Sequence, residues 1–213
     1  MRYFITATDT DAGKTHSTCL LLEALRAMGR DAVGYKPFAC GDRLDAQALQ
    51  RSGGGVPEDL DIINPIALKI PASPWAAALL ENRQVNVEAA RLGFASLCAA
   101  HQDVLIEGAG GWEVPLWQDQ TMADFAASLR IPILLVVNNR LGCLNHALLT
   151  LRNIEQRGLH CAGILLNHVA DTREAASISN ALVLRHFSRG VPIVAEIMHG
   201  ETRLDWPQEL PLD

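Results

Sequence analysis

The stretch Ala7-Thr8-Asp9-Thr10-Asp11-Ala12-Gly13-Lys14-Thr15 has residue types suited to binding phosphate. It directly follows a short apolar segment and precedes a helical pattern, and at such a junction backbone N–H groups and the helix N-terminus bind anions. Lys14 would reach the β- and γ-phosphates of a nucleotide, and the Thr15 hydroxyl would bind Mg²⁺. The strict pattern has glycine where this chain has Thr8, so a plain strand–turn–helix junction is the alternative. The position after the first strand favours a phosphate loop.

A carboxylate followed by glycines lies in the middle of the chain, in Val104-Leu105-Ile106-Glu107-Gly108-Ala109-Gly110-Gly111. Mg²⁺ takes oxygen ligands, and ligands of doubly wound proteins bind at the carboxyl ends of the parallel strands. An acid that ends a buried apolar strand is costly without a partner, which favours a functional Glu107 over a plain turn. The glycines would let backbone N–H groups approach an anion closely. Their spacing does not match the dinucleotide-binding fingerprint.

Lys36 ends another apolar segment, where it would neutralise a phosphate or a developing anion. Asp42 and Asp45 follow it in a stretch that the pattern predicts to be a loop. Charges of this kind are more often solvated. A functional role for these three residues is favoured only by their position after the end of a strand, where a doubly wound fold binds its ligands.

The elements that would position these side chains alternate between short apolar strands and longer helical patterns. We expect strands at Tyr3–Ala7, Asp31–Tyr35, Val104–Glu107, Ile133–Val137, Gly163–Asn167 and Ile193–Ile197. We expect helices at Lys14–Met28, Pro74–Glu81, Asn86–Ala100, Met122–Leu129, Asn145–Gln156 and Arg173–Phe187. This alternation predicts one α/β domain over residues 1–213, a doubly wound and mostly parallel sheet with helices on both faces. Arg51–Asp61, with three consecutive glycines, is expected to be the most mobile loop.

The composition is that of a globular protein, with 49% apolar and 20% charged residues. A net charge of −6 argues against nonspecific binding to nucleic acid or anionic membranes, because both need a basic face. The five cysteines form no C-x-x-C pair, which argues against a disulfide framework or a zinc site. No apolar run approaches the roughly 18 residues of a membrane-spanning helix, and no secretory leader pattern opens the chain. We expect a soluble, cytoplasmic protein.

Taken together, these blocks resemble the dethiobiotin synthetase family. The resemblance covers nearly the whole chain and rests on Thr8-Asp9-Thr10 before Gly13-Lys14-Thr15, Gly34-Tyr35-Lys36-Pro37, Ser73-Pro74, Glu107-Gly108-Ala109-Gly110-Gly111 and Leu141-Gly142-Cys143-Leu144-Asn145-His146-Ala147. It implies a P-loop NTPase fold and an ATP- and Mg²⁺-dependent ligase of biotin biosynthesis. In the implied reaction 7,8-diaminononanoate takes up CO₂ as a carbamate, ATP phosphorylates the carbamate, and the second amine closes the ring. The products are dethiobiotin, ADP and phosphate.

The resemblance also implies roles for single residues. Lys14, Lys36 and Thr10 would be catalytic, and Thr15, Asp45 and Glu107 would hold Mg²⁺. The ATP site would comprise these three metal ligands together with Asp11, Ala12, Gly13, Lys14, His16, Gly108, Ala109, Gly110, Asn167, His168, Met198, His199 and Gly200. The substrate would contact Thr10, Lys36, Cys40, Gly110, Gly142, Cys143, Leu144 and Asn145. Asn167 would read the adenine edge, and Asn145, at a helix N-terminus, would help to bind the substrate carboxylate. The family implies a homodimer with the substrate site at the subunit interface.

The chain departs from the family's pattern at several positions. Ala7 replaces a glycine, which would cost on the order of 1–2 kcal/mol if the residue needs a positive φ and little if it needs only a small side chain. Cys40 replaces a serine that contacts substrate. A tyrosine that binds the substrate carboxylate has no counterpart, because the chain has only Tyr3 and Tyr35. Arg173 or a serine would take its place.

Two other functions share a phosphate loop. A partner-regulated ATPase switch of the chromosome- or division-site-positioning type is the main alternative, but such proteins carry an additional lysine early in the loop, and Thr8–Ala12 contains none. A related amidoligase of cobalamin synthesis would need a glutamine-hydrolysing domain, for which we expect no room in 213 residues.

Overall fold

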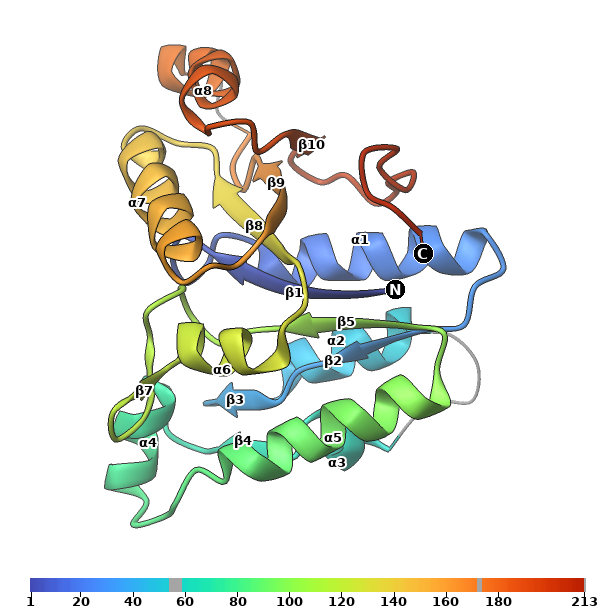
Figure 1. Cartoon of the computed structure of the whole chain (residues 1–213), viewed down its shortest axis with the longest axis vertical. Helices are drawn as coiled ribbons and strands as arrows, with labels where there is room; N and C mark the ends of the chain where they lie inside the picture. Colours follow the sequence, from blue (N-terminus) through green and yellow to red (C-terminus); the bar gives the residue numbers. More distant parts are fainter. Residues whose placement is uncertain (54–58, 172–173, 213) are drawn as a thin grey trace.

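The computed structural model describes residues 1–53, 59–171 and 174–212, and its centre is a six-stranded sheet (Figure 1). All neighbouring strands pair in parallel, in the order β10-β9-β8-β1-β5-β2. The strands are β1 (Arg2–Ala7), β2 (Ala32–Tyr35), β5 (Asp103–Glu107), β8 (Ile133–Asn138), β9 (Cys161–Asn167) and β10 (Ile193–Ile197). They are the six predicted strands, with ends shifted by at most two residues.

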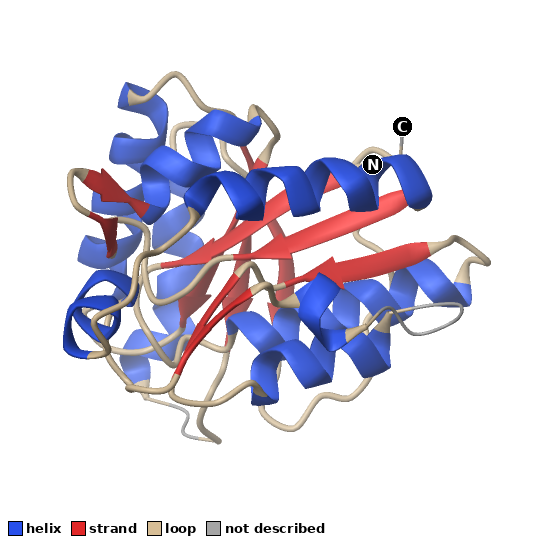
Figure 2. Ribbon diagram, turned by 90° about the horizontal axis from the view of Figure 1, so that it is seen from below, coloured by secondary structure: helices blue, strands red, loops and turns tan. Residues whose placement is uncertain are grey.

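Helices cover both faces of this sheet, as predicted (Figure 2). They are α1 (Lys14–Ala27), α2 (Leu44–Ser52), α3 (Leu60–Ile63), α4 (Pro74–Leu80), α5 (Val87–Ala100), α6 (Met122–Leu129), α7 (Cys143–Gln156) and α8 (Ala175–Phe187). Successive side chains of a strand point to opposite faces. Tyr3 and Ile5 therefore pack into the core beneath α1, whereas Phe4 packs into the core beneath α5 to α8. Two covered faces explain why the strands are apolar over most of their length.

Short elements between Lys36 and Asp61 correct the predicted loops. Phe38–Cys40 forms β3, which pairs in parallel with β4 (Ile66–Leu68), and α2 and α3 occupy much of the remainder. Strands of three residues are too short to show a period, and α2 buries only Ala46, Leu49 and Ser52. Residues 54–58 of the loop predicted at Arg51–Asp61 lie outside the described residues.

Three further details differ from the predicted elements. A small antiparallel hairpin of β6 (Pro115–Trp117) and β7 (Gln120–Thr121) follows the glycine stretch and escaped prediction because its strands are so short. Helix α7 begins at Cys143, two residues before the predicted start, and α8 begins at Ala175. Arg173, proposed as a substitute for the missing tyrosine, lies outside the described residues. Within the described ranges, no helix is long and apolar enough to cross a membrane.

The strand order decides where a ligand can bind. After β1 the chain moves to one side of it, to β2 and β5, and then crosses to the other side to form β8, β9 and β10. In a doubly wound sheet, the crevice for ligands lies at the carboxyl ends of the strands where this reversal occurs. The reversal places the crevice beside the end of β1, where the phosphate loop begins.

Candidate active site

The phosphate loop runs from the end of β1 to the start of α1. Gly13 is the N-cap of α1 and has φ 87°, a left-handed conformation that favours glycine. Asp11 also has a positive φ of 57°. Ala7 is still part of β1, is paired with Val136 and is not among the residues with a positive φ. Alanine therefore causes no backbone strain at position 7. Of the two reasons for a glycine there, a positive φ is excluded, and the need for a small side chain, which alanine meets, is left.

The end of β9 lies against this loop. The Asn167 Nδ2 atom donates a hydrogen bond to the carbonyl oxygen of Ala12 at 2.9 Å, and a Cβ added to Gly13 would lie 2.0 Å from the same nitrogen. Close to it, His199 Nδ1 lies 2.7 Å from the carbonyl oxygen of Val169. The structure thus brings Asn167, which was expected to read the adenine edge, next to the phosphate loop, through a contact between its amide and the loop backbone that the sequence did not reveal.

Four side chains meet where β2, β5 and α1 approach one another. Lys36 Nζ donates to Asp45 Oδ2 at 2.9 Å, to the carbonyl oxygen of Gly108 at 3.2 Å and to Glu107 Oε1. The Thr15 hydroxyl donates to Glu107 Oε1 at 2.8 Å. Lys36 and Glu107 are buried, whereas the side chain of Asp45 is 51% exposed. Position alone had suggested Lys36 and Asp45, and the structure places both in the cluster, with Asp45 in the first turn of α2.

The charges of this cluster determine its protonation. Burial acts to lower the pKa of Lys36, but the carboxylates of Glu107 and Asp45 outweigh it and hold that pKa above its usual value. Burial acts to raise the pKa of Asp45, but the charge and the hydrogen bond of Lys36 outweigh burial and hold that pKa below its usual value. Lys14 differs, because burial and then the charge of Lys36 lower its pKa to about 8. Lys36 is therefore a fixed cation, and a phosphate near Lys14 would favour the charged form of both.

The donor set fits Mg²⁺. Glu107 Oε2 is buried without a hydrogen-bond partner, and the Thr15 hydroxyl and the half-exposed Asp45 lie beside the same carboxylate. Mg²⁺ is commonly held by one or two carboxylates, with phosphate oxygens and water as its other ligands. No group of three or more His, Cys, Asp and Glu side chains suited to a metal occurs among the described residues. The site therefore suits a hard cation that a nucleotide helps to hold.

Two adjoining cavities share Thr10, Lys36, Asp45 and Gly110. One, of about 340 Å³, is also lined by Asp11, Gly13, Lys14, Thr15 and His16. The other, of about 440 Å³, is also lined by Phe38, Ala39, Cys40, Asp42, Pro71, Ala72, Ser73, Pro74, Ala109 and Val114. Of these, the segment Pro71–Pro74, Phe38, Ala39 and Val114 were not predicted as site residues. The Ser73-Pro74 pair was the available signal, because serine before proline marks the start of α4, where Ser73 caps the Ala76 N–H.

The predicted substrate-binding segment at residues 142–145 lies away from both cavities. Gly142, Cys143, Leu144 and Asn145 line neither of the two cavities. Gly142 is the N-cap of α7, with φ 89°, and Asn145 is the third residue of that helix and exposed. A carboxylate can bind at a helix N-terminus such as that of α7, but the residues there do not line this chain's own cavity.

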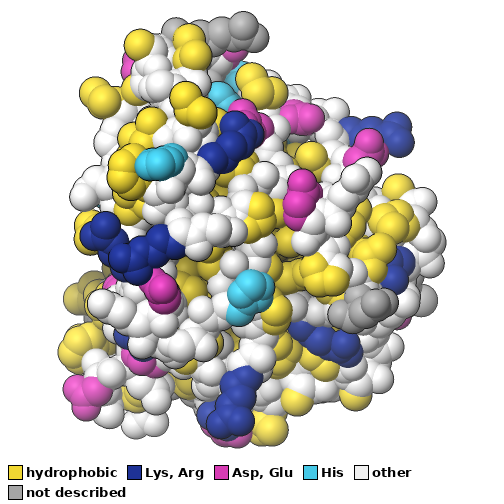
Figure 3. Space-filling model, turned by 45° about the horizontal axis from the view of Figure 1, so that its top comes forward, with side chains coloured by type: hydrophobic (Ala, Val, Ile, Leu, Met, Phe, Trp, Pro, Cys, Tyr) yellow, Lys and Arg dark blue, Asp and Glu magenta, His cyan; other side chains and the backbone are white. Residues whose placement is uncertain are grey.

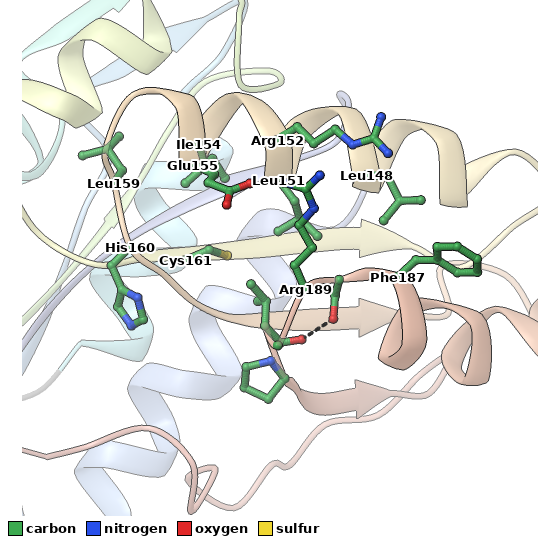
Figure 4. Close-up of a pocket in the computed structure, with 14 residues that line it drawn as sticks. Leu148, Leu151, Arg152, Ile154, Glu155, Leu159, His160, Cys161, Phe187 and Arg189 are labelled. Atoms are coloured by element: carbon green, nitrogen blue, oxygen red, sulfur yellow. Dashed lines mark hydrogen bonds and ion pairs between the residues drawn. The ribbon is translucent and has the colours of Figure 1, made fainter.

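A separate cavity of about 260 Å³ lies between α7 and the segment that joins α8 to β10 (Figure 4). Leu151, Ile154 and Cys161 contribute its apolar wall, and Arg189 forms an ion pair with Glu155 at 2.8 Å beside it. Its walls include residues just before β9 and β10, at the edge of the sheet opposite the phosphate loop. The cavity shares no residue with the cluster around Lys36.

Comparison with known proteins identifies the family. A family model described as an AAA domain matches residues 1–205. The chain is 45% identical over 208 residues to the ATP-dependent dethiobiotin synthetase BioD of Akkermansia muciniphila, covering 96% of each chain. The chain belongs to the dethiobiotin synthetase family. It is also 41% identical over 174 residues to BioD 1 of Salmonella typhi, covering 78% of this chain and 76% of that protein.

Solved structures of other P-loop proteins share only the fold with this dethiobiotin synthetase family member. The cell division protein MinD of Aquifex aeolicus superposes with a TM-score of 0.55 at 15% identity, covering 94% of this chain and 83% of that one. The septum site-determining protein MinD of Pyrococcus horikoshii, complexed with Mg-ADP, superposes with a TM-score of 0.54 at 17% identity, covering 93% of this chain and 82% of that one. These similarities confirm the predicted P-loop α/β architecture and carry no further argument about activity.

Proposed function

We propose that this protein is an ATP-dependent dethiobiotin synthetase, a cyclo-ligase that converts 7,8-diaminononanoate, CO₂ and ATP into dethiobiotin, ADP and phosphate. The observation that carries the proposal is the shared boundary of the two cavities. Thr10, Lys36, Asp45 and Gly110 line both, so a substrate in the larger cavity meets the terminal phosphate of a nucleotide in the smaller one. A P-loop ATPase switch of the MinD type would not require the second cavity.

The reaction has three balanced steps. One amine attacks CO₂ and loses a proton to give a carbamate. A carbamate oxygen then attacks the γ-phosphorus of ATP, which forms a carbamic–phosphoric anhydride and releases ADP. The second amine attacks the carbamate carbon, expels phosphate and loses a proton, which closes the ureido ring. Both nucleophiles belong to the substrates, so the protein's contribution is positioning and charge stabilisation.

Each site residue has a role in this scheme. Lys14 and Lys36 stabilise the charge of the carbamate and of the phosphoryl group in transfer, and Thr10 holds the substrate at the boundary between the cavities. Thr15, Asp45 and Glu107 would hold Mg²⁺, which supplies charge neutralisation at the phosphates when it is bound. Lys36 keeps its proton throughout, because the two carboxylates beside it raise its pKa. It acts as an electrostatic partner and not as a base.

The nucleotide base would occupy the surface formed by the ends of β9 and β10. Asn167 supplies an amide for the adenine edge, and His168 and residues 198–200 flank it. Support comes from the hydrogen bond that the Asn167 amide donates to Ala12, the residue before Gly13 in the phosphate loop. Cys40 lines the substrate cavity as a thiol whose pKa is raised by burial to about 11, so it remains a neutral contact for the diamine.

The substrate carboxylate is bound by a second copy of the chain. Residues 142–145 do not line this chain's own cavity. Apolar side chains are exposed on α7, which these residues begin, and on α8, which packs beside it. Leu149 of α7 is 55% exposed, and Ile178 and Leu182 of α8 are 71% and 72% exposed. Figure 3 shows hydrophobic side chains at the surface of the region where α7 and α8 lie. A homodimer would bury this surface and bring the α7 N-terminus of one subunit to the cavity of the other.

We further propose that residues 1–213 act as one synthetase domain in the cytoplasm, without nucleic-acid or membrane partners. The net charge of −6 supports this, and on the face shown in Figure 3 the basic side chains lie in separate groups.

The proposal is tested by incubating purified protein with 7,8-diaminononanoate, bicarbonate and MgATP, and by quantifying dethiobiotin by mass spectrometry. Product should form in a 1:1 ratio with released phosphate. ATP turnover that is independent of the diamine would contradict the proposal and favour a switch-type ATPase.

A further inference from the structure

Arg43 stands at the N-cap of α2 without capping that helix. Helix N-caps usually supply a side-chain oxygen to the first free N–H groups, and arginine has none. Asp42 Oδ1 accepts from the Leu44 N–H at 3.0 Å instead. The Arg43 guanidinium turns back to the end of α3, where Nε donates to Asn64 Oδ1 at 2.9 Å and Nη2 donates to the carbonyl oxygens of Leu60 and Asn64 at 2.7 and 3.0 Å.

Asn64 continues these hydrogen bonds to the backbone of Lys36. It is only 1% exposed, and its Nδ2 atom donates to the carbonyl oxygens of Lys36 and Ile66 at 2.7 and 3.3 Å. The backbone N–H of Lys36 donates to the carbonyl oxygen of Ile63 at 2.9 Å. The segment 63–66 therefore holds both backbone polar groups of Lys36, although it lies outside the six-stranded sheet.

These contacts join the two segments that carry Lys36 and Asp45. Strand β2 ends at Tyr35, the last residue paired with β5, so Lys36 is the first residue that the sheet does not fix. Asp45 lies two residues after Arg43, in the first turn of α2. The buried Asn64 amide thus holds the backbone at Lys36, and the Arg43 guanidinium ties the start of α2 to Asn64. Together they bring the two segments to the point where Lys36 Nζ contacts Asp45 Oδ2.

We propose that Arg43 and Asn64 are positioning residues, which set the placement of the Lys36 ammonium and the Asp45 carboxylate for phosphoryl transfer. The inference rests on the proposed function. Neither residue lines either cavity, so neither touches the reacting atoms. A misplacement of about 1 Å in a catalytic group can cost about 100-fold in rate, which makes this support consequential.

Asn64→Asp is the most informative variant. It preserves the shape of the side chain and an acceptor for Arg43, but it places an oxygen instead of a donor against the Lys36 carbonyl. We expect kcat to fall 10- to 100-fold, while the affinity for metal-free ADP stays within twofold of wild type because Lys14 and the phosphate loop are unchanged. Arg43→Gln should lower kcat in the same way, and Arg43→Lys should restore part of the loss. Arg91→Gln is the matched control, because its guanidinium pairs with the exposed Glu88 on α5, outside both the site and the proposed dimer surface.

A second measurement does not depend on turnover. Calorimetric titration of ADP with and without Mg²⁺ gives the gain in affinity that the metal confers, and we expect Arg43→Gln to reduce that gain at least threefold by displacing Asp45. Wild-type kcat and an unchanged Mg²⁺ effect in folded variants would overturn the inference, as would a loss of activity matched by an equal loss of metal-free ADP affinity. A wild-type protein that turns over no diamine would contradict the proposed function, and the Mg²⁺ effect would still decide this inference.

Discussion

Lys36 and Glu107, at the ends of the neighbouring strands β2 and β5, form an ion pair from which water is almost entirely excluded. The side chains are 4% and 0% exposed. Removing either partner from a buried pair leaves an uncompensated charge, which is strongly destabilising. The positive charge of Lys36 and the negative charge of Glu107 are therefore both in place in the crevice before any ligand enters. Because Glu107 Oε2 has no partner, one oxygen of this carboxylate remains available to a cation.

Lys36→Gln should lower turnover at least about 1000-fold while nucleotide affinity changes little, because the charge on the carbamate and the phosphoryl group is lost but Lys14 and the loop remain. The chain has one further lysine, Lys69, whose side chain is exposed. Lys69→Gln is therefore the control and should retain wild-type kcat. Calorimetric ADP titration and a phosphate-release assay measure both quantities. A parallel loss of ADP affinity in Lys36→Gln would place Lys36 in nucleotide binding.

Gly13→Ala should weaken nucleotide binding at least about 100-fold, because the added Cβ would lie 2.0 Å from Asn167 Nδ2 and the residue has φ 87°. Gly29→Ala is a matched control with φ 76° and no atom within 4 Å of its Cβ. It should share the conformational cost of on the order of 1–2 kcal/mol and retain affinity. Equal affinities of the two variants for ADP would show that the contact between Asn167 and the loop is unimportant.

Asn167→Ala should reduce the preference for ATP over GTP, because an amide that reads the adenine edge discriminates between the two bases. Competition binding with both nucleotides measures the ratio of their affinities. Losing the hydrogen bond to Ala12 also disturbs the phosphate loop, which weakens both nucleotides equally. An equal loss for ATP and GTP would therefore assign Asn167 to loop support alone.

Mixing two inactive variants tests the homodimer. Lys36→Gln removes the catalytic cation, and Asn145→Asp places a negative charge beside the proposed carboxylate site on α7. If α7 acts on the partner's cavity, each mixed dimer has one intact site, and co-refolded protein should regain about a quarter of wild-type kcat from random assortment. No recovery, with mixed dimers verified by mass spectrometry, would place both residues in the same subunit's site.

Asp103 should give the stability a measurable dependence on pH. Burial acts to raise its pKa, but hydrogen bonds from Arg30 and the N-terminal ammonium outweigh it and lower the pKa below its usual value. A lowered folded-state pKa contributes stability above the unfolded-state value and loses it as pH falls through the folded value, below about pH 4. Asp103→Asn should lower the free energy of unfolding by roughly 3 kcal/mol at pH 7. In urea unfolding the gap to wild type should narrow toward pH 3, and a constant gap would contradict the assignment.

The sequence predicted the central sheet well because its strands are mostly covered on both faces and therefore apolar over most of their length. Gly13, Lys14 and Glu107 were predictable for a related reason, since Glu107 ends one such strand and Gly13 and Lys14 complete the loop that follows another. Asp45 was harder, because α2 is short and mostly polar, and its link to Lys36 depends on a fold-back of the chain. Asn64 and Arg43 gave no signal at all. Their role arises from side-chain contacts between segments 21 residues apart, which no local pattern encodes.

The transfer of one oxygen atom from CO₂ to phosphate tests the central claim, phosphorylation of a substrate carbamate, most directly. The protein is incubated briefly with 7,8-diaminononanoate, MgATP and ¹⁸O-labelled CO₂, and the released phosphate and the product are analysed by mass spectrometry. Attack of the carbamate on ATP followed by ring closure predicts one ¹⁸O atom in the phosphate and one in the ureido carbonyl group. Unlabelled phosphate, formed at the same rate as dethiobiotin from fully labelled CO₂, would contradict the mechanism.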